Sequence, residues 1–122
     1  MELNASFPAQ VHKYIDDDWL NGDPAPAGDE TYGVDSVGAY VDCHKYWVPS
    51  QGVYLTMRPR GITIESGEVQ GTAYAFVNGY LWDENEAYRD SFSIPTAALM
   101  HSVAFRRIYR DNTTARGIRI YG

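Results

Sequence analysis

Alternation of apolar and polar residues with a period of two runs through most of the chain after residue 37 and limits the fold more than any other feature. Over 37–47, Val37, Ala39, Val41 and Cys43 occupy alternate positions, which is typical of a strand with one buried face. Similar runs cover 53–57, 62–65, 69–82 and 87–94. The turn sequences between them are Pro49-Ser50-Gln51-Gly52, Arg58-Pro59-Arg60-Gly61, Ser66-Gly67 and the acidic segment 83–86. Runs joined in this way predict consecutive antiparallel hairpins.

Residues 7–20 have a helical spacing instead. Val11, Tyr14, Ile15 and Trp19 recur at intervals of three and four, and Asn21-Gly22 is a typical helix end. The segment 21–36 holds two prolines, three glycines and four acids, and predicts a loop. Near the C-terminus, the pattern favours a short helix over 96–102 and then a hairpin of 103–110 with 116–121.

These elements predict an α+β fold. The expected architecture is a curved antiparallel β-sheet of about six or seven strands, connected as a meander, with the N-terminal helix packed on one face to bury its apolar side. A short helix near 96–102 completes it. The length of 122 residues fits a single domain over 1–122, divided into the helix at 7–20, an acidic Pro/Gly-rich loop at 21–36 and a β-rich core at 37–122.

The net charge of −6 is distributed unevenly. Residues 1–50 carry nine acidic and two basic side chains, whereas residues 51–122 carry seven acidic and eight basic ones. Asp16, Asp17 and Asp18 are expected in the last turns of the predicted helix, where the helix dipole disfavours negative charge. Either arginines compensate this acidic triplet or it serves a partner. Five arginines lie between positions 106 and 119, and ion pairing with the acidic half is the simplest use for them (Arg106, Arg107, Arg110, Arg116 and Arg119).

The residues that could carry chemistry do not form a recognisable catalytic motif. Cys43 and His44 are neighbours on a predicted strand, so their side chains point to opposite faces and do not form a dyad by themselves. The histidines lack the paired spacing of a metal site, and neither a metal nor a cofactor is expected. An enzyme or small-ligand binder remains an alternative, with Cys43, His44 and His101 meeting in a pocket between the helix and the sheet.

The leading interpretation is a non-catalytic protein that binds a partner protein through an acidic, tyrosine-rich surface. Ten tyrosines and three tryptophans exceed what a small core needs, and such side chains favour binding surfaces. The residues expected to contact the partner are acidic residues and one tyrosine of the predicted helix end, loop and hairpin tip: Asp16, Asp17, Asp18, Asp23, Asp29, Glu30, Tyr32, Asp83, Glu84 and Glu86.

A nucleic-acid-binding enzyme with a basic groove would suit this charge. Phage and plasmid inhibitors of restriction or CRISPR systems act as a class by mimicking nucleic-acid charge, and the analogy here is one of charge and size. Direct nucleic-acid binding is not expected of an acidic chain. No apolar run is long enough to cross a bilayer, and a cytoplasmic protein is expected. A structural subunit of an assembly such as a virion is the third interpretation.

Overall fold

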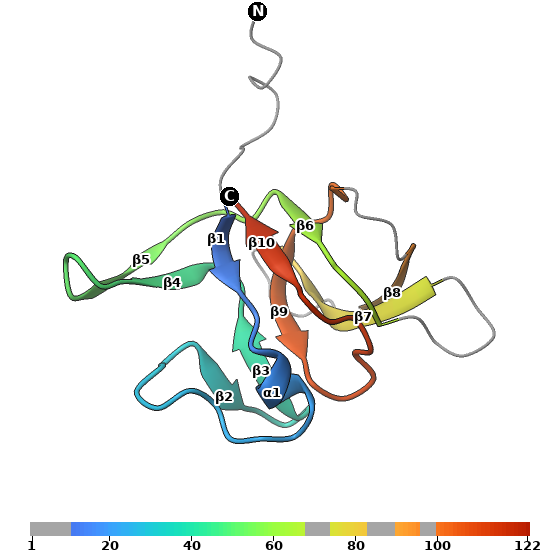
Figure 1. Cartoon of the computed structure of the whole chain (residues 1–122), viewed down its shortest axis with the longest axis horizontal. Helices are drawn as coiled ribbons and strands as arrows, with labels where there is room; N and C mark the ends of the chain where they lie inside the picture. The colour runs from blue at the N-terminus through green and yellow to red at the C-terminus, as the bar shows by residue number, and fades with distance from the viewer. Residues whose placement is uncertain (1–10, 68–73, 83–89, 96–99) are drawn as a thin grey trace, which may run out of the picture.

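The computed structural model describes residues 11–67, 74–82, 90–95 and 100–122, and this part of the chain is almost entirely β-structure (Figure 1). One helix occurs in it, the four-residue α1 (Asp17–Leu20). The strands are β1 (Val11–Tyr14), β2 (Tyr32–Val34), β3 (Ala39–Asp42), β4 (Lys45–Val48), β5 (Val53–Thr56), β6 (Gly61–Thr63), β7 (Tyr74–Leu81), β8 (Asp90–Pro95), β9 (Phe105–Tyr109) and β10 (Arg119–Tyr121).

These ten strands of the described residues form three antiparallel sheets. The first has the order β1-β10-β6, the second β2-β3-β9-β7-β8, and the third is the two-stranded ribbon β4-β5. In Figure 1 the ribbon extends to one side of the body, and the β7–β8 hairpin lies toward the opposite side. The ribbon is therefore the element that stands out most from the body of the protein.

The hydrophobic core combines residues from the two larger sheets. Val41, Val77 and Ile108 of the five-stranded sheet are fully buried, as are Ile62 and Ile120 of the three-stranded sheet. The buried core of the described chain takes no residue from β4 or β5. Burial is the main way in which apolar side chains stabilise a fold, and it does not explain why most of the ribbon's side chains are apolar.

The predicted N-terminal helix packed on the sheet is wrong, because the described part of 7–20 begins as a strand. Val11–Tyr14 forms β1 and pairs with β10, with a register shift between Val11 and Lys13. Tyr14, expected on the buried stripe, is 66% exposed, whereas Lys13 is buried opposite Ile120. Residues 7–10 lie outside the described residues. A bulged strand followed by a single helical turn gives the apolar residues the same spacing as a continuous helix would.

The acidic triplet lies at the beginning of a helix and not at its end. Asp16 is the N-cap of α1, and its Oδ1 accepts a hydrogen bond from the Asp18 N–H at 2.9 Å. Asp17 and Asp18 occupy the first turn, where negative charge is favoured by the helix dipole. The helix dipole therefore favours the triplet where it lies, and its position needs no partner to explain it.

The predicted meander is also wrong, because several strands pair with distant partners. β6 pairs with β10 and not with β5, and β9 lies between β3 and β7. The expected hairpin of 103–110 with 116–121 does not exist, since β9 and β10 belong to different sheets. Of the helix predicted at 96–102, residues 96–99 lie outside the described residues, and His101 forms a β-bridge with Ile62. The turn sequence at 58–61 predicts where β5 ends, but not that the next strand, β6, pairs with β10.

Two hairpins are as predicted. The turn at 49–52 joins β4 to β5, and β7 pairs with β8 with Ala75 and Val77 on the buried face. Gly79 accommodates a close approach of β9, because a Cβ at this position would overlap the Arg107 carbonyl oxygen. The predicted loop 21–36 is irregular as far as Thr31, and β2 then adds an edge strand to the larger sheet.

Candidate functional site

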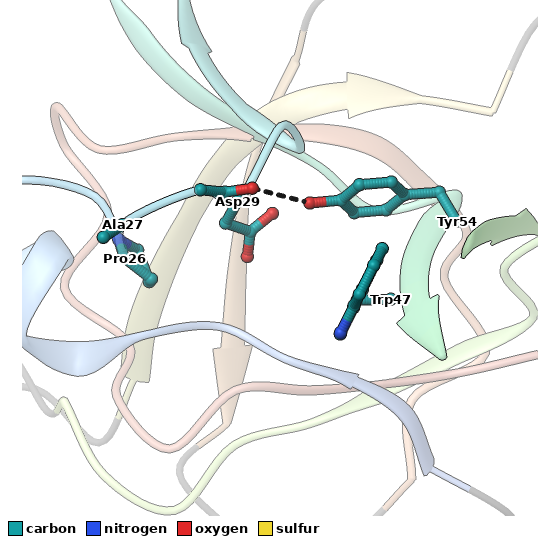
Figure 2. A pocket seen from close by; sticks show the side chains of 6 residues that line it. Pro26, Ala27, Asp29, Trp47 and Tyr54 are labelled. Carbon is teal, nitrogen blue, oxygen red and sulfur yellow. Dashed lines mark hydrogen bonds between the residues drawn. The ribbon is translucent and has the colours of Figure 1, made fainter. Parts of the chain in front are cut away.

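A hollow of about 360 Å³ lies between the ribbon and the segment 26–29. Its walls come from both elements: Pro26, Ala27, Gly28, Asp29, Trp47 and Tyr54. Figure 2 shows the Asp29 carboxylate between Pro26 and Ala27 on one side and the rings of Trp47 and Tyr54 on the other. The hollow therefore combines an acidic group with two aromatic side chains.

The ribbon register places both rings in the wall. Trp47 is directly opposite Tyr54 across the two strands, so both side chains project from the same face. Their ring centroids are 5.0 Å apart, with the planes tilted by 59°. The indole of Trp47 remains 48% exposed. A large apolar side chain left half in water at the edge of a hollow is typical of a binding surface.

Tyr54 joins the ribbon to the segment opposite. Its hydroxyl accepts a hydrogen bond from the Glu30 N–H at 2.8 Å and donates one to the Gly28 carbonyl at 3.1 Å (Figure 2). Gly28 has a φ of 78°, a left-handed conformation that favours glycine. The chain thus turns at Gly28 and is held against the ribbon, and these two bonds fix the width of the hollow.

Asp29 is oriented from behind by a buried chain of hydrogen bonds. Its Oδ1 accepts from the Thr31 N–H at 2.9 Å and from the Thr31 hydroxyl at 2.7 Å, and Thr31 in turn accepts from Lys13 Nζ at 2.8 Å. Burial lowers the pKa of Lys13, and the charge of Asp29 acts in the opposite direction. No hydrogen bond from a described residue reaches Asp29 Oδ2, which leaves one carboxylate oxygen for a ligand.

A second cluster of acids and rings lies on the five-stranded sheet, and there the charges are paired. Arg107 donates from Nε to Asp42 and from Nη1 to Asp35, both at 3.0 Å, and its guanidinium lies 4.0 Å from the Tyr40 ring centroid. The Tyr109 hydroxyl donates to Asp35 at 2.6 Å. This cluster joins the two halves of the chain through Arg107, as predicted for that arginine, whereas Arg119 pairs with Glu65 of its own half.

Electrostatics in this second cluster favour a charged Asp35 and a protonated, neutral Tyr109. Burial acts to raise the pKa of Asp35, but hydrogen bonds from Tyr109 and from the Val37 and Gly38 N–H groups, together with the Arg107 charge, hold the pKa below its usual value. Burial and the bond to Asp35 raise the pKa of Tyr109. The cluster therefore stabilises the fold with its own partners.

The predicted partner-contacting residues divide into four groups. Asp29 lines the hollow and Glu30 is next to it, exposed. Asp16 and Asp17 bind backbone N–H groups of Asp18 and Gly117, and the Tyr32 hydroxyl accepts from the Asp16 N–H. Asp18 and Asp23 are exposed near α1. Asp83, Glu84 and Glu86 lie outside the described residues.

The residues of the enzymatic alternative lie in separate environments. Cys43 is fully buried, and burial raises the pKa of its thiol to about 12. His44 contacts the Trp82 ring, and His101 is beside β6. No hydrogen bond or ring contact of the described chain joins these three side chains. Burial also lowers the pKa of His44.

The described residues contain neither a candidate metal site nor a candidate membrane-spanning helix. No group of three or more histidine, cysteine, aspartate or glutamate side chains there is placed to hold a metal ion. None of the helices in that part is both long and apolar enough to span a bilayer.

The sequence predicts Asp29 as a partner contact, and this residue lines the hollow, but Trp47, Tyr54 and the segment 26–28 are not predicted there. Trp47 and Tyr54 lie within two predicted strands, and nothing in the sequence marks them as site residues. Their placement on one face follows from the turn at 49–52, which was recognised, because it fixes the register of the hairpin. The sequence does not indicate that this face contacts Gly28 and Glu30, which precede Tyr54 by 26 and 24 residues.

Comparison with known proteins gives no match to a family model, to a curated protein sequence or to a solved structure.

Proposed function

We propose that the protein is a non-catalytic binding protein that engages a partner protein through the ribbon and the segment 26–30, together called the ribbon–loop surface. The observation that carries this proposal is the hollow between them, with a half-exposed tryptophan beside a carboxylate. Aromatic side chains at the centre of a surface, surrounded by polar groups, are the usual energetic anchors of a protein interface.

The other face of the ribbon extends this surface. Tyr46 and Val48 pair with Leu55 and Val53 across the strands, so the four side chains share one face. Leu55 is 36% exposed and Val53 is 42% exposed. A two-stranded ribbon gains little stability from such residues by itself. An apolar face that contributes to none of the buried core of the described chain is explained more simply by contact with another molecule.

Charge favours a partner with a basic surface. Glu30 belongs to the ribbon–loop surface and Asp23 lies three residues before the segment 26–30 in sequence, and both are exposed. The first fifty residues carry nine acids against two basic side chains. Opposite charge accelerates association and selects among partners. A nucleic-acid-binding enzyme with a basic groove is one class of protein with this property, and the proposal extends to a charge-mimicking inhibitor of such an enzyme.

The test is a capture experiment with the tagged full chain and a lysate of the source organism or its host, washed with increasing salt. We expect one partner that is released as salt rises, because screening weakens exposed charge pairs. Capture should fall by about tenfold for the double variant Asp23→Lys with Glu30→Lys, since it replaces attraction with repulsion. Asp111→Lys makes a matched charge reversal at an exposed turn outside this surface and should leave capture unchanged.

Two results would contradict the proposal. One is capture that is equal for all three proteins. The other is recovery of the bait alone at every salt concentration. A defined homo-oligomer in solution would then favour the structural-subunit interpretation.

A further inference from the structure

We infer that the hollow is the binding site for an arginine side chain of the partner, with the guanidinium against the face of Trp47 and an N–H donated to Asp29 Oδ2. This inference rests on the proposed function and names the group that the surface recognises. It follows from three observations about the chain's own arginines, the carboxylate of Asp29 and the shape of the hollow.

The chain repeatedly places an arginine on an aromatic ring. Within the described residues the guanidinium-to-centroid distances are 4.0 Å for Arg107 on Tyr40, 5.0 Å for Arg106 on Trp82, 5.1 Å for Arg110 on Trp19 and 5.7 Å for Arg119 on Tyr14. Of the three tryptophans, Trp47 is the one with no cation over its ring in that part of the chain. A cation within about 6 Å of an indole face is attracted by its quadrupole, and tryptophan is the best partner.

A second hollow already has an arginine beside its tryptophan. This hollow, of about 210 Å³, is lined by Trp19, Ala25 and Arg110 among others. Arg110 supplies the cation from within the chain: its Nε donates to the Trp19 carbonyl at 2.8 Å while the guanidinium lies over the same residue's ring. The hollow at Trp47 has the ring and a carboxylate, but no arginine of its own among the residues that line it.

The carboxylate of Asp29 is poised for one more donor. Both hydrogen bonds to it from described residues end on Oδ1, so Oδ2 is available. Lys13, the cation behind this group, is 7% exposed and reaches Asp29 only through the Thr31 hydroxyl. Lys45 shares the ribbon face with Trp47, but no described interaction places its ammonium on the ring. An external cation would therefore complete a pair that the chain leaves open.

The size and flatness of the site favour arginine. A volume of about 360 Å³ is near the lower limit for small-molecule pockets and suits a single side chain. Figure 2 shows the Trp47 ring edge-on, so that one of its faces looks across the hollow toward Pro26 and Ala27. A planar guanidinium can stack on that face while its edge donates to a carboxylate, which a lysine ammonium cannot do equally well.

The test is a titration of the full chain with N-acetyl-arginine amide, followed by the NMR signals of the three indole N–H groups. Trp47→Phe identifies the Trp47 signal. We expect that signal alone to shift, with a dissociation constant on the order of a few millimolar, as befits one side-chain contact. Trp19 and Trp82 are internal controls, because each already carries an arginine. The lysine amide should bind about threefold more weakly, and the neutral citrulline amide should bind at least tenfold more weakly.

Equal shifts with the arginine and citrulline amides would overturn the inference, as would no shift of the Trp47 signal at about 50 mM ligand. Trp47→Leu gives a second check in the capture experiment. If this variant and wild type capture the salt-sensitive partner equally while the Asp23/Glu30 double variant does not, the arginine site is wrong and the proposed function stands. If the amide binds as expected but no partner is captured, the proposed function fails and the site stands.

Discussion

The sheet cluster at Arg107 and the hollow at Trp47 are built from the same kinds of side chain, but the chain completes only the first. In the cluster, Arg107 joins Asp35 to Asp42 and covers Tyr40. In the hollow, Asp29 lies near Trp47 and Tyr54, and the residues that line it include no cation. The comparison separates a set of contacts that holds the fold together from one that is open to a ligand.

The two regions also differ in what holds them in place. Asp35 accepts hydrogen bonds from both Arg107 and Tyr109, and these contacts contribute to the free energy of folding. Asp29 and Tyr54 are held from behind, by Thr31 and by the backbone of Gly28 and Glu30. The Asp29 carboxylate and the Tyr54 ring are therefore oriented in advance, which lowers the entropy cost of binding at the proposed site.

Removing the cation from the complete cluster should have the largest effect on stability. Arg107→Ala leaves Asp35 and Asp42 close together without their partner, and we expect a loss of about 2–3 kcal/mol in the free energy of unfolding. Urea denaturation followed by fluorescence measures it. Arg107→Lys keeps the charge but loses the planar fork, so its stability should be intermediate. A loss below about 0.5 kcal/mol for the alanine variant would remove the distinction between the two regions.

Asp35 should make the cluster sensitive to acid. Because its folded pKa is lowered, its contribution to stability is present above the unfolded pKa of about 4 and is lost as the pH falls through the folded pKa. Asp35→Asn should cost about 1 kcal/mol at pH 6, a low value because part of the side chain is exposed. Urea midpoints measured at decreasing pH should show the stability difference between the variant and wild type becoming smaller toward about pH 2.5. A difference that does not change with pH would show that the carboxylate charge is not what matters.

Removing the Tyr54 hydroxyl should have a smaller effect on stability but a clear one on the hollow. Tyr54→Phe loses the bonds to Gly28 and Glu30, at an exposed position, and we expect a cost of about 0.5–1 kcal/mol. Arginine-amide affinity should fall several-fold, because the segment 26–29 is no longer held at a fixed distance from Trp47. Tyr46→Phe, on the other ribbon face, is the matched control. Equal affinities for these two variants would show that the tether does not shape the site.

The comparison also shows what could be read from the sequence. The alternation over 37–57 and the turn at 49–52 were sufficient to predict the ribbon, because a short turn fixes its register locally. The spacing of Val11, Tyr14, Ile15 and Trp19 was misleading, since a bulged strand and a capped helical turn bury Ile15 and Trp19 while exposing Tyr14. The local pattern identified residues with apolar character, but not the geometry that buries them.

Neither cluster could be assembled from local patterns. Arg107 meets Asp35 across 72 residues and Tyr54 meets Gly28 across 26. The charge imbalance predicts that arginines of the second half pair with acids of the first. Among the described ion pairs, Arg107 does so with Asp35 and Asp42, whereas Arg119 pairs with Glu65 of its own half. Strand order decides which acids remain unpaired, and the alternation of apolar and polar residues does not specify the strand order. Asp29 and Asp35 are both acids of the same predicted loop, yet they lie in different clusters.

The most direct test of the central claim is to supply the missing cation from within the chain. Ala27 is exposed and lines the hollow across from Trp47, so Ala27→Arg can place a guanidinium against the indole and Asp29 (Figure 2). We predict that this variant moves the Trp47 indole signal in the direction that the arginine amide does, and that its affinity for the amide falls by at least tenfold. Ala27→Gln, which is neutral, should retain binding. Unchanged amide binding by Ala27→Arg, or an equal loss with Ala27→Gln, would contradict the account.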